Sequence, residues 1–224
     1  MPILQGPLRG KKWIVGSQRH AFWLGAYEPH MQRLIEREVR AGTIVYDVGA
    51  NVGFYTLLAA HLTVTGKVFA FEPLPANVAY LNKHLDLNLI KNVTVFDVAI
   101  SDHVGWSSFA QEGTGAMGRL QDRGSLRVAT TTLDALLQEE KIAPPNYIKM
   151  DIEGEEIKAL AGAQVCFREN RPILFLAIHG NSVQRACCEV LRSWHYDISV
   201  IEQSSPERAE LLCRPLTASG VSIS

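Results

Sequence analysis

The stretch IVYDVGANVG (residues 44–53) carries the strongest fold signal in the chain. It begins as a β-branched, apolar run and ends in a turn that contains Gly49 and Gly53. Glycine permits a tight turn and lets the backbone approach a ligand closely, and a helical pattern follows over residues 54–62. The stretch predicts a buried strand, then a turn at a helix N-terminus where a ligand can bind. A glycine-rich strand-to-helix turn without a ligand is the plainer alternative.

The same strand-then-helix unit recurs along the chain. Apolar strand patterns cover residues 67–71, 93–96, 147–150 and 172–178, and helical patterns cover residues 75–87, 155–168 and 182–194. Strands that are apolar throughout, each followed by an amphipathic helix, indicate a parallel sheet covered on both faces. We therefore expect an α/β fold with a single doubly wound, Rossmann-like sheet.

Two segments depart from this rhythm. Residues 102–132 contain five glycines and predict an inserted hairpin or loop over the edge of the sheet. Residues 198–201 and 211–214 predict a terminal antiparallel pair. Upstream, residues 1–42 form an N-terminal extension, with a short strand or hairpin near residues 10–16 and a helix over residues 29–39. The remaining residues, 43–224, form the main domain.

Composition narrows the class of protein. A chain of 224 residues with 47% hydrophobic residues is long and apolar enough for one packed domain, and it is unlike a disordered chain. Lysine and arginine number 22 against 23 aspartates and glutamates, which disfavours binding of nucleic acid or of an anionic membrane by bulk charge. Neither a signal-peptide pattern nor an apolar run of about 20 residues is present, and the four cysteines form no CxxC pair. These features predict a cytoplasmic protein with reduced cysteines.

Acidic residues follow the first three strands, where ligands of open α/β sheets bind. Asp47 ends the first strand, and Glu72 follows the second, where its carboxylate can accept both hydroxyls of a ribose. Asp97 follows the third strand and can accept the exocyclic amine of an adenine. An exposed acid at Glu72 and a turn cap at Asp97 are the structural alternatives. Glu72 and the glycine turn, whose Gly53 lies 19 residues earlier, together favour a nucleoside ligand.

The last two parallel strands end in candidate catalytic residues. Alternation places Lys149 and Asp151 on one side of their strand, with Asp151 at the tip facing the substrate. Glu153 and Glu155 are expected in the first turn of the next helix, where the helix dipole favours carboxylates. His179 follows the fifth strand and is suited to act as a general base or a metal ligand. A hydrogen-bonded structural histidine is an equally ready interpretation.

At these residues the sequence resembles the FkbM-type family of S-adenosylmethionine-dependent O-methyltransferases. The matching stretches are VYDVGANVGFYTLLA (45–59), GKVFAFEPLPANVAYLNKHLDLN (66–88), VFDVAISD (95–102), TTLDALL (131–137), YIKMDIEGEEIKALAGA (147–163) and RPILFLAIHG (171–180). The resemblance covers about residues 44–180 and implies a seven-stranded sheet that ends in an antiparallel hairpin.

The resemblance also implies roles for individual residues. The methionine end of S-adenosylmethionine would lie against Asp47, Gly49, Asn51 and Gly53, and Thr56 would also contact the cofactor. Glu72 would hold the ribose, Asp97 and Val98 the adenine, and Asp151 would lie near the transferable methyl group. The sequence departs from the family at residue 177, since many members have a Glu-x-His where this chain has Ala177-Ile178-His179. This departure puts a metal site in doubt.

The implied reaction is direct displacement at the sulfonium methyl by an oxygen nucleophile, in which the protein supplies alignment and proton removal. His179 or Asp151 is the expected base, and His179 is better matched to neutral pH. The alternative is a divalent cation shared by Asp151 and His179, which lacks a clear third ligand and is not favoured.

The expected acceptor is a hydroxyl of a small molecule or a glycan. Trp23, Tyr27 and the loop at residues 113–118 could cover the acceptor, whereas Trp13 is expected to pack against the edge of the sheet. A cofactor-binding module without catalysis is one alternative. A nicotinamide-dependent oxidoreductase is another, disfavoured because Asn51 replaces the second glycine of G-x-G-x-x-G. No apolar helical face is left unassigned, so the sequence does not indicate an oligomeric state.

Overall fold

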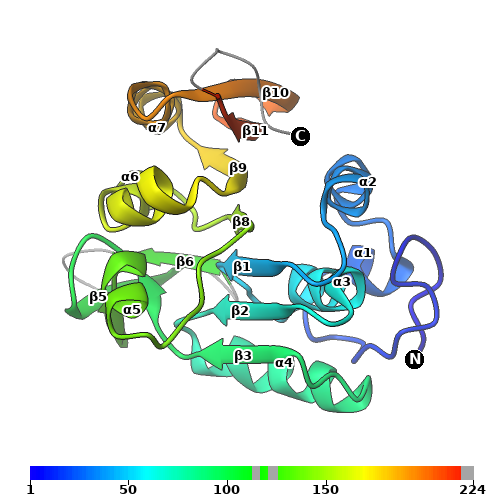
Figure 1. Cartoon of the computed structure of the whole chain (residues 1–224). Helices are drawn as coiled ribbons and strands as arrows, with labels where there is room; N and C mark the ends of the chain where they lie inside the picture. Colours follow the sequence, from blue (N-terminus) through cyan, green and yellow to red (C-terminus); the bar gives the residue numbers. More distant parts are fainter. Residues whose placement is uncertain (113–116, 121–125, 218–224) are drawn as a thin grey trace.

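The computed structural model describes residues 1–112, 117–120 and 126–217. Its main sheet has seven strands in the order β10-β11-β9-β8-β1-β2-β3 (Figure 1). Their bounds are β1 Ile44–Val48, β2 Lys67–Phe71, β3 Val93–Phe96, β8 Tyr147–Met150, β9 Ile173–His179, β10 Tyr196–Ser205 and β11 Arg208–Pro215. Strands β1, β2, β3, β8 and β9 are parallel, and β11 pairs antiparallel with both β9 and β10. The predicted doubly wound sheet with a terminal antiparallel pair is confirmed.

Helices cover both faces of this sheet (Figure 1). Their bounds are α1 His20–Leu24, α2 Pro29–Glu38, α3 Phe54–Thr63, α4 Pro75–Leu87, α5 Leu133–Gln138, α6 Glu156–Ala161 and α7 Asn181–Ser193. Alternation along the strands divides the core into two layers: Tyr46 and Val48 pack with α5, α6 and α7, whereas Val45 packs with α2, α3 and α4. Each layer is a continuous cluster of buried apolar side chains, and together they hold the strands in place.

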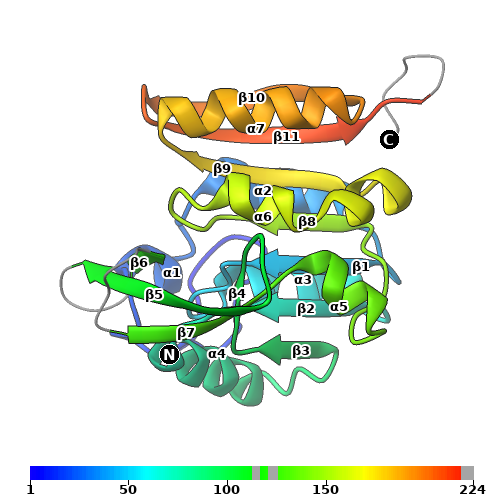
Figure 2. The same cartoon turned by 90° about the vertical axis from the view of Figure 1, so that its left-hand side faces the viewer.

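The insertion after β3 forms a second sheet. Its strands, β4 Ala99–Ile100, β5 Gly105–Glu112, β6 Met117–Leu120 and β7 Leu126–Thr131, are ordered β4-β7-β5-β6 and lie beside the main sheet (Figure 2). The predicted hairpin is therefore part of a four-stranded sheet. The short strand β4 pairs in parallel with β7.

The helix expected over residues 155–168 is broken. Helix α6 ends at Ala161, and a π-helical turn over Cys166–Asn170 follows. Gly162 lies so close to a neighbouring segment that a Cβ atom there would be 2.0 Å from the carbonyl oxygen of Ser101. The close approach of the chain at Gly162 accounts for the break, and periodicity alone does not reveal it.

The N-terminal extension packs on the α3–α4 side of the sheet. The segment expected near residues 10–16 as a short strand or hairpin contains no extended strand; it pairs with the N-terminus through an antiparallel bridge between Pro2 and Lys12. Trp13 is buried and stacks on His84 of α4 with ring centroids 3.8 Å apart, so it packs on a helix and not on the sheet edge. Among the described residues, no helix combines the length and hydropathy required to cross a membrane.

Candidate active site

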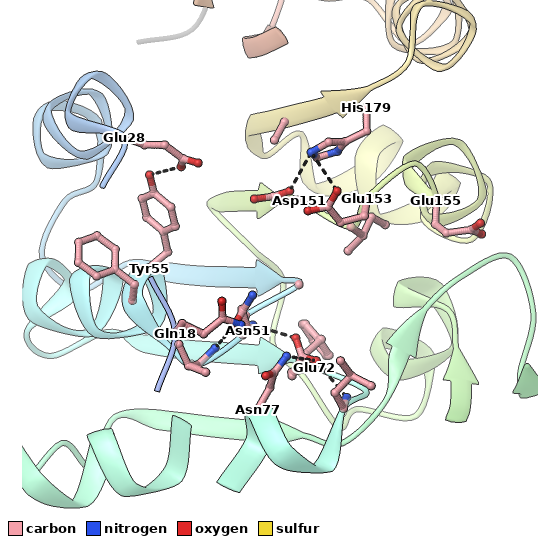
Figure 3. Close-up of a pocket in the computed structure, with 18 of the residues that line it drawn as sticks. Gln18, Glu28, Asn51, Tyr55, Glu72, Asn77, Asp151, Glu153, Glu155 and His179 are labelled. Atoms are coloured by element: carbon pink, nitrogen blue, oxygen red, sulfur yellow. Dashed lines mark hydrogen bonds and ion pairs between the residues drawn. The ribbon is translucent and has the colours of Figure 1, made fainter. Parts of the chain in front are cut away.

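A pocket opens at the carboxyl ends of β1, β2, β8 and β9 (Figure 3). One part is lined by residues 49–52 and 71–74 and by Val98; the other is lined by residues 151–153, 177–179 and 208–210. The chain runs from β1 to β2 and β3 on one side of the sheet and from β8 to β9 on the other, so the strand order reverses between β1 and β8. Ligands of open α/β sheets bind at such a switch point.

Glu72 is the anchor of the first part of the pocket. Its Oε2 atom accepts a hydrogen bond from the backbone N–H of Asn51 at 2.8 Å, and Oε1 accepts from Leu74 N at 3.0 Å and from Asn77 Nδ2 at 3.2 Å. Burial raises the pKa of Glu72, while these hydrogen bonds act in the opposite direction. The carboxylate therefore fixes the glycine turn as well as facing the pocket.

Asn51 shapes the turn after β1. It has a left-handed backbone conformation (φ +51°), and its Oδ1 atom accepts hydrogen bonds from Gln18 Nε2 at 2.9 Å and Val52 N at 2.7 Å. Gly49 (φ +82°) lies so close to Asp151 that a Cβ atom would be 2.0 Å from the Asp151 carbonyl oxygen. The glycine turn thus touches the tip of β8, which joins the two parts of the pocket.

Three predicted cofactor residues lie behind this turn and do not line the pocket of the described residues: Asp47, Gly53 and Thr56. Asp47 is fully buried, and its Oδ2 atom accepts a hydrogen bond from Thr56 Oγ1 at 2.6 Å. Its other oxygen has no hydrogen-bond partner within the described part of the chain. Burial raises the pKa of Asp47, and the nearby charge of Lys149 lowers it in part.

Of the two residues predicted to contact adenine, only one lines the pocket formed by the described residues. Val98 lines the pocket, whereas Asp97 is exposed and lies outside the lining formed by the described residues.

His179 is held by a buried carboxylate. Its Nδ1 atom donates a hydrogen bond to Glu156 Oε1 at 3.0 Å, and the side chain of Glu156 is fully buried. The other ring nitrogen, Nε2, lies 3.7 Å from Asp151 Oδ1 and 3.5 Å from Glu153 Oε2 (Figure 3). Burial alone lowers the pKa of His179, but the bond to Glu156 and the charges of Asp151 and Glu153 raise it overall.

Asp151 lies between two basic side chains, Lys149 and His179. Its Oδ2 atom lies 3.3 Å from Nζ of the buried Lys149, and its Oδ1 atom faces His179. Burial opposes ionisation of Asp151, but Lys149 and His179 lower its pKa overall. The structure thus brings together the two predicted catalytic residues, Asp151 and His179, at one wall of the pocket.

Sequence reasoning missed the roles of two carboxylates that face His179, Glu153 and Glu156. Glu153 was expected in the first turn of a helix, but α6 begins at Glu156 and Glu153 occupies a left-handed turn (φ +54°). Its carboxylate faces His179, while Glu155 pairs with Lys158 at 2.8 Å. One ligand atom each from Asp151, Glu153 and His179 lie within 4.8 Å of one another. The cluster could hold a metal ion.

Aromatic and acidic side chains form the wall opposite the glycine turn. The Tyr55 hydroxyl donates to Glu28 Oε2 at 2.7 Å, and Lys149 Nζ lies 4.7 Å from the centre of the Tyr55 ring. Of the predicted covering residues, Tyr27 lines the pocket and Trp23 does not, within the described residues. The loop at 113–118 falls largely outside the described residues.

The amino-acid sequence matches one family model, described as the methyltransferase FkbM domain, over residues 47–208. Hexuronic acid methyltransferase AglP of Haloferax volcanii is 28% identical over 137 residues, which cover 60% of this chain and 56% of that protein. The 31-O-demethyl-FK506 methyltransferase FkbM of Streptomyces tacrolimicus is 28% identical over 162 residues, 57% of this chain and 62% of that protein. The chain therefore spans less than two thirds of the length of both relatives.

Solved structures share the fold. A methyltransferase FkbM from Methylobacillus flagellatus superposes with a TM-score of 0.55 at 18% identity, covering 88% of this chain and 55% of that one. Aeropyrum pernix fibrillarin, solved with natively bound S-adenosyl-L-methionine, superposes with a TM-score of 0.52 at 10% identity, covering 78% of this chain and 67% of that one. At these identities the likeness concerns the fold alone, which is that of class I Rossmann-like methyltransferases.

Proposed function

We propose that this chain, which belongs to the FkbM methyltransferase family, transfers a methyl group from S-adenosylmethionine to a hydroxyl of a small molecule or glycan. The observation that carries the proposal is the continuity of one pocket. It runs from the glycine turn and Glu72 to the facing side chains of Asp151 and His179. A donor and an acceptor bound in its two parts would meet at the tip of β8.

The first part of the pocket fits the cofactor. Gly49 leaves the backbone open at the turn, Asn51 offers a polar side chain for the methionine end, and Glu72 offers carboxylate lone pairs for ribose hydroxyls. Val98 supplies an apolar contact for adenine. Asp47, Gly53 and Thr56 would act from behind by fixing the turn, and Asp97 would reach the adenine only from the rim of the pocket. When bound, S-adenosylmethionine supplies a methyl group activated by its sulfonium.

Asp151 and His179 are the proposed catalytic residues. A hydroxyl is a weak nucleophile until its proton is removed, so the acceptor must lie against groups that favour its loss. Nε2 of His179 and Oδ1 of Asp151 point at each other across 3.7 Å on the pocket wall. Glu156 holds the ring from its far side, which keeps Nε2 directed at the acceptor.

The relatives support the acceptor class. One is named for a hexuronic acid and the other for 31-O-demethyl-FK506. The net charge of −1 gives no support to a nucleic-acid substrate. A catalytically inactive cofactor-binding module is less well supported, because Asp151 and His179 are both present and face each other.

Calorimetric titration of the purified chain with S-adenosylhomocysteine tests the proposal, with NAD as the control ligand. We expect micromolar binding of S-adenosylhomocysteine and no binding of NAD. Binding of NAD, or of neither ligand, would overturn the cofactor assignment. A panel of hydroxyl compounds with isotopically labelled S-adenosylmethionine would then identify the acceptor.

A further inference from the structure

We propose that Asp151, Glu153 and His179 form a binding site for a divalent cation at the wall of the pocket. The site needs only these side chains, whereas its role in catalysis rests on the proposed function. The sequence alone identified Asp151 and His179 as possible metal ligands but did not identify a third ligand. The left-handed turn at Glu153 supplies it by directing a second carboxylate at His179.

The spacing of the three side chains suits a cation better than direct hydrogen bonds. Nε2 of His179 lies 3.7 Å and 3.5 Å from the two carboxylates, beyond the usual hydrogen-bond range of about 2.7–3.2 Å. Two ligands that are each about 2.1 Å from an ion, at right angles to it, are separated by about 3 Å. The two separations from Nε2 exceed this value by about 0.5 and 0.7 Å, which side-chain rotations can close.

Glu156 prepares His179 for this role. A ligand histidine usually donates its other ring N–H to a carboxylate, which fixes the tautomer and the orientation of the ring. Here Nδ1 donates to the fully buried Glu156 at 3.0 Å, and the backbone N–H of Gly154 donates to the same oxygen at 3.1 Å. In the neutral imidazole this leaves the Nε2 lone pair directed at two carboxylates, an arrangement that a cation between them would stabilise.

The remaining contacts leave room for a substrate. Nζ of Lys149 pairs with Oδ2 of Asp151, so Asp151 offers only its other carboxylate oxygen, Oδ1, as a metal ligand. All three ligands line the pocket, so positions on a bound cation would face the acceptor. One imidazole and two carboxylates suit Mn²⁺ or Zn²⁺ better than Ca²⁺, which prefers six to eight oxygens.

The cation would act on the acceptor hydroxyl. A hydroxyl oxygen bound to a divalent cation loses its proton to solvent water far more readily than a free one. That oxygen then forms the new bond to the methyl carbon as the carbon–sulfur bond breaks, which yields a methyl ether and S-adenosylhomocysteine. His179 and Asp151 would promote proton loss by holding the cation.

The test is a Mn²⁺ titration of the chelator-treated full chain, followed by the loss of the free Mn²⁺ electron paramagnetic resonance signal. We expect one Mn²⁺ per chain, and at least tenfold weaker binding in the Glu153→Gln and His179→Gln variants. Matched controls are His103→Gln, at an exposed His–Asp pair outside the pocket, and Glu139→Gln, at a surface ion pair with Lys141. Both controls should bind Mn²⁺ as the unchanged chain does.

Two results would overturn the cation site. One is the absence of Mn²⁺ binding to the unchanged chain at millimolar metal. The other is equal affinity in the pocket variants and the surface controls. Glu153→Gln is the more informative variant, because Glu153 is partly exposed and its loss leaves the buried Lys149–Asp151 pair intact. A parallel titration with S-adenosylhomocysteine separates the two proposals, since Mn²⁺ binding without cofactor binding would contradict only the methyltransferase function.

Discussion

Glu210 of β11 lies directly across from Ala177 of β9 in the antiparallel register of the two strands. Opposite residues in an antiparallel pair point to the same face of the sheet, and both of these line the pocket. The sequence lacks a carboxylate at residue 177, where the family resemblance leads us to expect one. The adjacent strand places a carboxylate on the same wall instead.

Glu210 makes a pH-dependent contribution to stability. Burial, with the nearby charges of Glu28, Glu202 and Asp151, raises the pKa of Glu210 from 4.5 to about 7. The folded state therefore favours the protonated form, and the stability that this provides is present below about pH 4.5 and lost as pH rises through about 7. We expect Glu210→Gln to raise the melting temperature at pH 8 relative to the unchanged chain, with little difference at pH 5. An equal shift at both pH values would contradict a titrating Glu210.

Replacing Glu72 by alanine should weaken binding of S-adenosylhomocysteine by about 1.5–3 kcal/mol, the scale of lost hydrogen bonds to a charged group. Calorimetry measures this change directly. Because Glu72 also holds the backbone of Asn51, the control is Asn77→Ala, which removes one partner of Glu72 and keeps its carboxylate. If the Glu72→Ala variant binds with unchanged affinity, Glu72 does not hold the ribose.

Replacing His179 by alanine should lower turnover and leave the affinity for S-adenosylhomocysteine nearly unchanged, because His179 lines the part of the pocket proposed for the acceptor. Single-turnover methyl transfer and calorimetry on the same preparation separate the two quantities. Loss of cofactor binding in this variant would assign His179 a structural role.

Replacing Gly162 by alanine should destabilise the protein by about 1–3 kcal/mol, the usual cost of forcing extra atoms into a packed site. The added Cβ atom would lie 2.0 Å from the carbonyl oxygen of Ser101, a backbone atom that cannot rotate away. Urea unfolding measures the difference in free energy. The control is Gly10→Ala, since a Cβ atom at Gly10 meets nothing within 4 Å, although its φ of +87° still costs some strain. Equal destabilisation of both variants would show that crowding at Gly162 is unimportant.

The sequence predicts those parts of the fold that depend on residues close together in the chain. An apolar strand followed by a glycine turn is a local signal, and it placed β1 and the turn at Asn51 correctly; the apolar run of β2 is likewise local. Asp151 and His179 were found because parallel strands bring their carboxyl ends to one edge of the sheet.

The features that sequence reasoning missed depend on distant contacts. Glu153 faces His179 because the chain turns left-handed before α6, which helical periodicity does not indicate. Glu210 reaches the pocket through the register of β11 against β9, and Trp13 finds its partner, His84, 71 residues further along the chain. Each of these depends on which segments meet in three dimensions, and no short stretch of sequence encodes that.

The order of the strands along the chain determines when each part of the pocket can form during synthesis. Its glycine turn and Glu72 lie in the first half of the chain, whereas Arg208 and Glu210 come from β11, which inserts between β9 and the earlier β10. Protein chains emerge from the ribosome N-terminus first, and their early segments begin to fold first. A growing chain thus completes the glycine turn and Glu72 well before it supplies Arg208 and Glu210, so the pocket wall is complete only once the last strand has inserted.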